Sequence, residues 1–414
     1  MTRAIVLGGL ALALLAPTAR VRGQEVDRGR IQAQAAGQAA EADRLFKRGE
    51  WEPAMALYEA ERASRAALGD DRYEAYALRA IGLCRAELGD DEAAIDAWKQ
   101  ARALDLKRDD KGYAGYDDFL AAQAEVRLGR PTDAIKTLDR AFPLLSEAVD
   151  RDHEADARLV MTRTLVTLGR SREARPHVAR ALSLAEGLAD AWRIADAWAS
   201  AGQVEGALGN LSMALERFSD AQDAFEQQGR AADAAWMETV TGSTLVLLGR
   251  PGPALARFEE AARLHQHLED GGALAEDLTA IAGLHLEAGR PDPALAAGRR
   301  AVESARDADD REREVEARVR LAQVEARRGD WKAAAETLDE AVTLIRQVAR
   351  DDPAEQVRVL LTAAETDRRA GLHPRALDRL EAARRLADDP ALPALRQAVA
   401  DALRAFGDMK KRGD

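Results

Sequence analysis

The residues best suited to chemistry in this sequence are its six histidines and its single cysteine. His153 and Glu154 begin like a helical zinc motif, but no second histidine follows four residues after the first. His265 and His267 are two residues apart, which places them on opposing sides of a helix and favours solvated side chains over a metal site. Cys84 has no partner for an intrachain disulfide or a cysteine-based zinc site, and its small apolar helix position predicts a packed thiol.

The acidic residues are the second group that could bind a metal or move a proton. The segment 307–310 resembles the start of a calcium-binding loop, but Glu312 occupies the sixth position, which requires glycine, and Arg318 the twelfth, which requires glutamate. Other paired acids stand where helices are expected to start, and a carboxylate there accepts hydrogen bonds from free N–H groups. The sequence has no phosphate-binding glycine loop and no Gly-x-Ser-x-Gly motif. We therefore predict no catalytic residue, no cofactor and no metal site, and we expect that the protein is not an enzyme.

Length and composition narrow the class of protein further. The 414 residues exceed one ordinary globular core, so either several domains or one extended repeat architecture is expected. The chain is 47% apolar but only 4% aromatic, and its apolar content is mainly alanine and leucine, which favours helices and argues against an all-β fold. Because Lys and Arg total 60 against 72 Asp and Glu, the cationic surplus that drives nucleic-acid binding is missing.

Glycine recurs every 40 residues through most of the chain, a spacing typical of repeat proteins. The series consists of Gly49, Gly89, Gly129, Gly169, Gly209, Gly249, Gly289 and Gly329, followed by Gly371 after a slip of two residues. Each glycine is followed five residues later by alanine and nine residues later by a large apolar residue, with Gly298 as the one exception. These steps fall on one face of a helix, so an amphipathic helix is predicted after each glycine.

A second helix is predicted before each glycine. A small residue that lets two helix backbones approach stands seven positions upstream, at Ala42, Gly82, Ala122, Thr162, Gly202, Gly242, Ala282, Ala322 and Ala364. The glycine itself stands where a residue with positive φ ends a helix, and the proline, serine or aspartate that follows several of these glycines is a typical helix start. Each repeat is therefore predicted to be a helix-turn-helix hairpin, and charged segments such as 69–71 and 269–272 link the repeats.

This order of small residue, glycine, alanine, large apolar residue and alanine resembles the tetratricopeptide repeat, or TPR. The common form of that repeat has a period of about 34 residues. The longer period here is similar to the subclass found in kinesin light chains and bacterial regulators, which the stretch 88–98 matches closely. The resemblance covers residues 29–405 and leaves no room within them for the catalytic modules that bacterial relatives often carry. It implies an all-α, right-handed α-solenoid of about nine hairpins, whose first helices line a concave groove.

The resemblance also implies which residues face that groove, namely those 13, 10, 6 and 2 positions before a glycine. The residues read off in this way are Tyr76, Arg79, Leu83, Tyr116, Phe119, Gln123, Arg127, Asp156, Arg163, Asp196, Gln203, Trp236, Thr239, Ser243, Glu276 and Thr279. Their mixture of aromatic, basic and hydrogen-bonding side chains suits an extended peptide or another protein. In the alternative interpretation, the aromatic residues fill gaps between repeats and the charged residues only solvate the wall.

The leading hypothesis from the sequence is a non-catalytic binding protein whose partner is a protein or an extended peptide. Two other roles fit the same repeats. One is a structural spacer or assembly scaffold, and the other is a regulatory subunit of a separately encoded enzyme, such as a protease-like partner.

The two ends of the sequence predict where the protein is found. Arg3 is followed by thirteen residues without a polar side chain, 4–16, and then by Pro17, which is the layout of a secretory signal peptide and too short for an ordinary membrane span. We expect a signal peptide at 1–23, a short linker at 24–28 and export to the periplasm or the medium of a bacterial cell, with no membrane insertion of the mature chain. An uncleaved N-terminal membrane anchor is the alternative. The basic segment 406–414 is expected to be a solubilising tail.

Overall fold

The computed structural model describes the backbone of residues 10–350 and 352–412, and the side-chain surroundings of residues 28–350 and 352–407. Over these residues the chain forms nineteen helices and no strand, so the predicted all-α class is confirmed. The chain divides into two compact units, Met1–Asn210 and Leu211–Asp414, hereafter unit 1 and unit 2.

Most helices are about 17 residues long and are separated by short turns, as the repeat period requires. Unit 1 contains α1 (Leu10–Lys47), α2 (Trp51–Leu68), α3 (Asp71–Glu87), α4 (Asp91–Lys107), α5 (Lys111–Arg127), α6 (Pro131–Glu147), α7 (Arg151–Thr167), α8 (Ser171–Leu188) and α9 (Ala191–Ala207). Unit 2 contains α10 (Leu211–Gln227), α11 (Ala231–Leu247), α12 (Pro251–His267), α13 (Gly271–Glu287), α14 (Pro291–Asp307), α15 (Arg311–Arg328), α16 (Trp331–Val348), α17 (Pro353–Arg369), α18 (His373–Leu386) and α19 (Pro393–Arg412).

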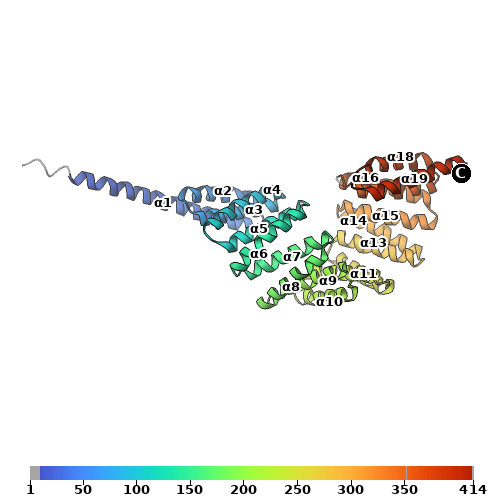
Figure 1. Ribbon diagram of the computed structural model, residues 1–414, viewed down its shortest axis with the longest axis horizontal. Coiled ribbons are helices and arrows are strands. Elements are labelled where there is room, and N and C mark those ends of the chain that lie inside the picture. The colour runs from blue at the N-terminus through green and yellow to red at the C-terminus, as the bar shows by residue number, and fades with distance from the viewer. Residues whose placement is uncertain (1–9, 351, 413–414) are drawn as a thin grey trace, which may run out of the picture. The chain divides into compact units, whose positions relative to one another are not determined.

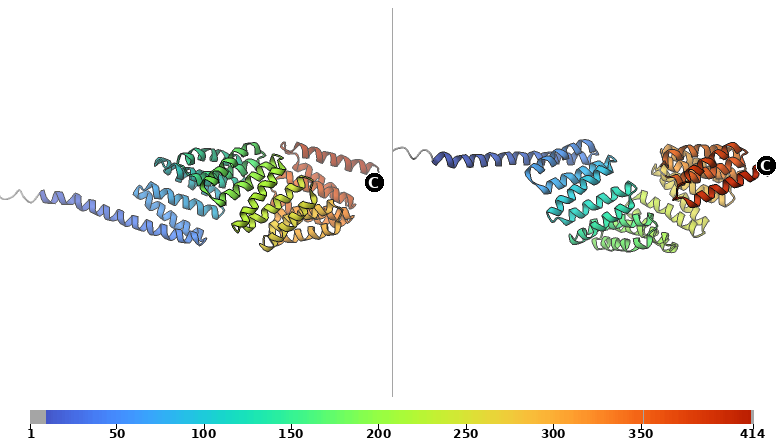
Figure 2. Two further views of the ribbon diagram at one scale, coloured as in Figure 1. Left: turned by 90° about the horizontal axis from the view of Figure 1, so that it is seen from below. Right: turned by 45° about the horizontal axis from the view of Figure 1, so that its top comes forward.

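Within each unit, successive helices pack as antiparallel pairs, and the pairs stack side by side (Figure 1, Figure 2). The first helices of neighbouring hairpins also contact each other, as α5 contacts α7 and α7 contacts α9 in unit 1, and as α13 contacts α15 in unit 2. Among the described residues, no two second helices make a comparable contact. The first helices therefore lie on the inner, more crowded side of each stack, and each unit is an α-solenoid of TPR-like hairpins.

The turns confirm the role predicted for the recurring glycines. All nine adopt a positive φ, between +67° and +91°, at the end of a first helix. At Gly89 the turn is closed by hydrogen bonds from the Gly89 N–H to the Ala86 carbonyl, at 3.0 Å, and from the Asp90 N–H to the Arg85 carbonyl, at 2.8 Å. The sequence analysis missed a second set of left-handed positions at the ends of second helices. These are the glycines Gly69 and Gly229 and the non-glycine residues Asp109, Val149, Ala189, Glu269 and Asp309.

Each of these non-glycine residues is followed by an aspartate, and four of the five aspartates cap the next first helix through their side chains. Asp150 accepts a hydrogen bond from the N–H of His153, and Asp190 accepts one from the N–H of Arg193. A left-handed residue costs about 1 to 2 kcal/mol, and an aspartate cap contributes about 1 kcal/mol. The cap therefore offsets much of the strain of the residue directly before it, which explains why these turns tolerate a side chain.

The core of a hairpin is built from a small residue opposite a large one. A Cβ added to Gly82 on α3 would lie 2.4 Å from Nε1 of Trp98 on α4, so only glycine fits this register beside the tryptophan. The Trp98 side chain is fully buried, and its Nε1 donates a hydrogen bond of 3.2 Å to the Arg79 carbonyl. At the exceptional Gly298, Leu321 of the following hairpin lies 3.3 Å from the place a Cβ would take, so a neighbouring repeat fills the gap.

The two ends of the structure bear on the boundaries predicted from sequence. Helix α1 runs without a break from Leu10 to Lys47, so the predicted linker at 24–28 and residues 10–23 of the predicted signal peptide lie inside it. The rest of that segment, residues 1–9, lies outside the described residues. In the part of the chain that the structure describes, no helix is both long enough and apolar enough to span a bilayer. Helix α19 extends into the predicted basic tail as far as Arg412.

Candidate functional site

The inner side of unit 1 is marked by tyrosine. The chain has five tyrosines, and four of them occupy equivalent positions, two in the first turns of α3 and two in those of α5. Tyr73, Tyr76 and Tyr113 are 45%, 42% and 50% exposed, and Tyr116 is half-buried. The sequence analysis named Tyr76 and Tyr116 but missed Tyr73 and Tyr113. These two stand three residues earlier on the same helix face, so the helical period contained the signal.

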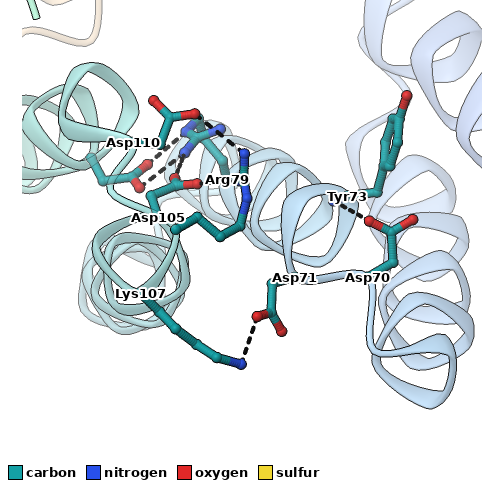
Figure 3. Close-up of polar contacts among 9 residues, drawn as sticks. Asp70, Asp71, Tyr73, Arg79, Asp105, Lys107 and Asp110 are labelled. Carbon is teal, nitrogen blue, oxygen red and sulfur yellow. Dashed lines mark hydrogen bonds and ion pairs between the residues drawn. The ribbon is translucent and has the colours of Figure 1, made fainter.

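Neighbouring contacts hold the first turn of α3 in place, as Figure 3 shows. The Asp70 carboxylate accepts a hydrogen bond from the Tyr73 N–H at 3.4 Å and so caps the helix. Asp71 forms an ion pair of 2.6 Å with Lys107 at the end of α4. The position of the exposed tyrosine rings is thereby tied to the hairpin behind them.

A pocket of about 300 Å³ lies beside these tyrosines, between α1, α2 and α3. Its lining residues are Asp43, Phe46, Lys47, Tyr58, Tyr76, Arg79, Ala80 and Leu83. The structure thus brings together the three groove residues predicted on α3. The residues on α1 were missed because the register was read only from the second repeat onward. Counting six and two positions back from Gly49 gives Asp43 and Lys47 directly.

Asp43 is the polar centre of this pocket. Its Oδ1 accepts a hydrogen bond of 2.6 Å from the Tyr58 hydroxyl and one of 3.0 Å from the Tyr76 hydroxyl. Burial and the neighbouring Asp43 carboxylate raise the pKa of Tyr58 above its ordinary value and raise the pKa of Tyr76 to about 12. Both hydroxyls therefore remain protonated donors at neutral pH.

Arg79 forms the wall of the pocket through a buried charge cluster, which Figure 3 shows in part. Arg79 is 7% exposed, its Nε donates to Asp117 at 2.6 Å, and its Nη2 donates to Asp105 at 2.5 Å. The Tyr113 ring centroid lies 4.6 Å from the guanidinium carbon, a cation–π distance. Burial raises the pKa of Asp117 to about 7, although the hydrogen bond from Arg79 opposes the shift. Arg79 is thus committed to protein carboxylates.

The other predicted residues on α5 have different environments. Tyr116 stacks against His153 with ring centroids 4.2 Å apart, and Phe119 is buried in the core between hairpins. Gln123 is half-buried, whereas Arg127 is exposed and its Nε donates to both oxygens of Asp91 at 3.1 Å. Phe119 therefore fills a gap between repeats, as the alternative interpretation allowed.

A second, more polar group lies on α7 and α9 of unit 1. Asp156 accepts two hydrogen bonds of 2.9 Å from Arg193, which the sequence analysis did not name. Arg163 is exposed and interacts electrostatically with Asp196 and Asp156. Gln203 is half-buried. Three of the four predicted residues on these helices therefore form one charged cluster.

The remaining predicted residues belong to unit 2 and do not form one cluster. Trp236 is half-buried, and Thr239 is buried with its hydroxyl donating to Asp277 at 2.8 Å. Glu276 pairs with Arg313 at 3.0 Å. Ser243 is exposed and lines a pocket of about 330 Å³ whose other lining residues include Val246, Leu247, Phe258, Leu284 and Arg320.

A further pocket of about 280 Å³ lies in unit 2, on α13, α15 and α17. It includes Thr279, which the sequence analysis placed in the groove, and Glu316, Val319 and Gln323, which it did not name. The last three stand 13, 10 and 6 positions before Gly329, so the same register extended by one repeat would have found them.

The histidine and cysteine environments bear on catalysis and metal binding. His265 was expected to be solvated, but it is 2% exposed and its Nδ1 lies 2.7 Å from Oδ2 of Asp277, because its helix face packs against α13. That prediction was wrong. Cys84 is fully buried, as predicted, and burial raises its pKa to about 11. Within residues 28–350 and 352–407, no group of three or more histidine, cysteine or acidic side chains is arranged to hold a metal ion.

The buried polar contacts follow the repeat. Arg79, Asp105 and Asp117 stand at the same three repeat positions as Thr239, His265 and Asp277, 160 residues further on. In unit 1, Arg79 of a first helix donates both to Asp105 of the second helix and to Asp117 of the next first helix. In unit 2, Asp277 accepts from Thr239 of the preceding first helix and contacts His265 of the preceding second helix. These clusters join one hairpin to the next, so they stabilise the packing of the solenoid.

Comparisons with known proteins bear on the fold. No protein-family model and no curated protein matches this sequence. A solved signal-transduction ATPase from Pyrococcus horikoshii, a STAND protein with a tetratricopeptide repeat sensor, is similar over 83% of this chain and 55% of its own, with 14% identity and a TM-score of 0.57. This chain thus spans about half of that protein.

Two Rap-type structures are similar over nearly their whole length. The apo form of RapI matches 67% of this chain and 99% of its own, at 12% identity and a TM-score of 0.55. A Rap protein complexed with competence and sporulation factor matches 89% and 99%, at 15% identity and a TM-score of 0.54. The solved neighbours therefore confirm the predicted TPR-like fold.

Proposed function

We propose that this protein is non-catalytic and binds an extended peptide, or an extended segment of another protein, along the inner helices of unit 1. The observation that carries the proposal is the repetition of exposed tyrosines at equivalent positions of α3 and α5. A rigid ring with a hydroxyl at its tip offers a large contact area at a small cost in conformational entropy, and tyrosine is enriched where proteins bind each other. Successive hairpins present these rings side by side, which suits an elongated partner.

The solved neighbours support this choice of ligand class. The similar Rap protein was solved in complex with competence and sporulation factor, so at least one protein with a similar fold binds a partner. The chemistry of unit 1 agrees, because its inner residues carry hydrogen-bond donors, acceptors and aromatic rings. Groups of these kinds are sufficient to bind an extended peptide.

The test begins with selection of binders from a random peptide library against the full chain. Affinity for a selected peptide is then measured by calorimetry for a variant that combines Tyr76→Ala with Tyr113→Ala. We expect the pair to weaken binding about 30-fold, since two anchors at about 1 kcal/mol each amount to about 2 kcal/mol. Leu106→Ala is the matched control, because Leu106 is an exposed apolar side chain on the second helix α4.

One outcome of this binding experiment would contradict the proposal. If the tyrosine variant melts like the parent protein and binds selected peptides with unchanged affinity, the inner face of unit 1 is not the binding surface. Light scattering on the protein without ligand addresses the scaffold role, because defined oligomers in the absence of a partner favour assembly over peptide binding.

Export is a second part of the proposal, and it is supported by the apolar segment 4–16 after Arg3. We expect the protein outside the cytoplasm and cleaved near Gly23, so that Gln24 becomes the first residue. Mass spectrometry of the N-terminal peptide from the periplasm or the medium tests this directly. An intact N-terminus on protein found only in the cytoplasm would refute export, and an intact N-terminus on membrane-bound protein would favour an anchor.

A further inference from the structure

The pocket beside the tyrosines is lined by apolar surfaces and one acidic group. Its interior combines the apolar surfaces of Phe46, Ala80 and Leu83 with a single carboxylate, that of Asp43. A volume of about 300 Å³ stands at the lower end of ligand pockets, so it suits one long side chain better than a whole small molecule.

The orientation of the Asp43 carboxylate is fixed by the protein and leaves one oxygen unused. Oδ1 accepts from the Tyr58 and Tyr76 hydroxyls, whereas Oδ2 has no hydrogen-bond or ion-pair partner among the described residues. The carboxylate is half-buried, so a ligand atom that replaces its remaining water would do so in partly apolar surroundings. A hydrogen bond from a charged donor is stronger there than one from a neutral donor.

The other charges of the lining do not cancel this carboxylate. Arg79 is matched by the two aspartates that hold it, Asp105 and Asp117. Lys47 is exposed near the end of α1 and forms no ion pair with the described residues. Asp43 is therefore the one carboxylate of the lining, and no opposite charge among the described residues forms an ion pair with it.

We infer that this pocket binds a basic side chain of the partner, lysine or arginine, with its aliphatic stem against Phe46 and Leu83 and its cation on Oδ2 of Asp43. The inference rests on the proposed function and names the chemistry of its ligand. The Tyr76 ring flanks the cation, and a cation beside an aromatic ring is attracted by the electron-rich face. An acidic side chain would meet the carboxylate and be repelled, and an apolar one would leave Oδ2 without a partner.

The charge of the whole chain favours the same partner. The formal net charge is -12, so a basic peptide is attracted at long range and its encounter is accelerated. Long-range attraction does not select one pocket, but it favours basic peptides, as the Asp43 carboxylate does locally.

The test uses tyrosine labelled with ¹³C in the ring, because five tyrosines give few signals and two of them donate to Asp43. The probes are three heptapeptides that differ only in a central lysine, norleucine or glutamate in a glycine and alanine background. We expect the lysine peptide to shift the Tyr58 and Tyr76 signals and to bind at least about tenfold more tightly than the norleucine peptide. The glutamate peptide should not shift these signals.

Asp43→Asn is the decisive variant, because the amide oxygen still accepts from both hydroxyls while the charge is removed. We expect the preference for lysine over norleucine to fall to about unity in this variant. Asp96→Asn is the matched control, since Asp96 lies on α4 with its side chain 71% exposed, and it should leave the preference unchanged.

Three results would overturn the inference: norleucine binding as tightly as lysine, glutamate binding better than either, or an unchanged lysine preference in Asp43→Asn. Failure of every probe to move the Tyr58 and Tyr76 signals would overturn it as well. The proposed function has a separate outcome, because library peptides that bind through Tyr76 and Tyr113 without a basic residue would support peptide binding while excluding this ligand class.

Discussion

Replacing Gly82 by alanine tests whether the hairpins pack as the structure describes. The new Cβ would lie 2.4 Å from Nε1 and 2.7 Å from Cδ1 of the Trp98 ring, closer than real Cβ contacts. The tryptophan is fully buried and cannot swing into solvent without opening the hairpin. The substitution therefore forces either α3 and α4 apart or the ring out of its place.

The size of the effect follows from three contributions. Overpacking of a core costs about 1 to 3 kcal/mol, and this contact is near the upper end. Moving the ring also breaks its hydrogen bond to the Arg79 carbonyl, now 3.2 Å long, which adds about 1 kcal/mol. Alanine recovers about 1 kcal/mol in a helix interior. We expect Gly82→Ala to lower the free energy of unfolding by about 2 to 3 kcal/mol.

The assay is urea unfolding followed by circular dichroism, with two matched variants. Gly37→Ala lies inside α1, where an added Cβ meets nothing within 4 Å, so it should stabilise the protein by about 1 kcal/mol. Combining Gly82→Ala with Trp98→Leu recreates the alanine and leucine pair found at Ala122 and Leu138, and should recover at least half of the loss. The reasoning is refuted if Gly82→Ala is as stable as Gly37→Ala, or if the double variant recovers nothing.

Two further predictions concern the buried cluster of Arg79, Asp105 and Asp117. Arg79→Leu leaves the buried Asp117 carboxylate without its cation, while Asp105 keeps its ion pair with Arg108, and should lower the free energy of unfolding by about 3 to 5 kcal/mol. Lys111→Leu, which breaks the exposed ion pair of Lys111 with Glu147, should cost much less than this, and equal losses in urea titrations would contradict this contrast. The pKa of Asp117 is raised to about 7 by burial, so between its ordinary pKa and this value the folded state binds more protons than the unfolded state. The contribution of Asp117 to stability should therefore fall as pH rises from about 4 to about 7, and a pH series should show this slope in the parent and not in Asp117→Asn.

The repeat itself was predictable from sequence because a glycine with positive φ ends each first helix. A positive φ at the end of every first helix requires a residue without a Cβ penalty, so Gly49, Gly129 and the others are visible as a series. The turns after second helices were not visible, because Val149 and Glu269 adopt the same backbone conformation without an equivalent mark in the sequence. Aspartate caps that follow several of them were the only local signal.

The candidate site was predictable only in part, because one register was applied alike to all repeats. The position ten residues before the glycine was assigned to the groove, yet Arg79, Phe119 and Thr239 at that position are buried between hairpins. Backbone spacing tells which helix face a residue occupies, but it does not tell how closely the next hairpin approaches that face. The cluster around His265 was missed for the same reason, since its partner Asp277 belongs to the next repeat.

We propose that a partner lies along the inner helices of unit 1, and site-specific photocrosslinking can detect that contact. A photoreactive phenylalanine analogue is placed at position 113 on α5 and, in a second protein, at position 106 on α4. We predict that a selected peptide, and the native partner in the producing cell, are captured from position 113 and not from position 106. Capture from position 106 with none from position 113 would place the binding surface on the outer helices and contradict the proposed function.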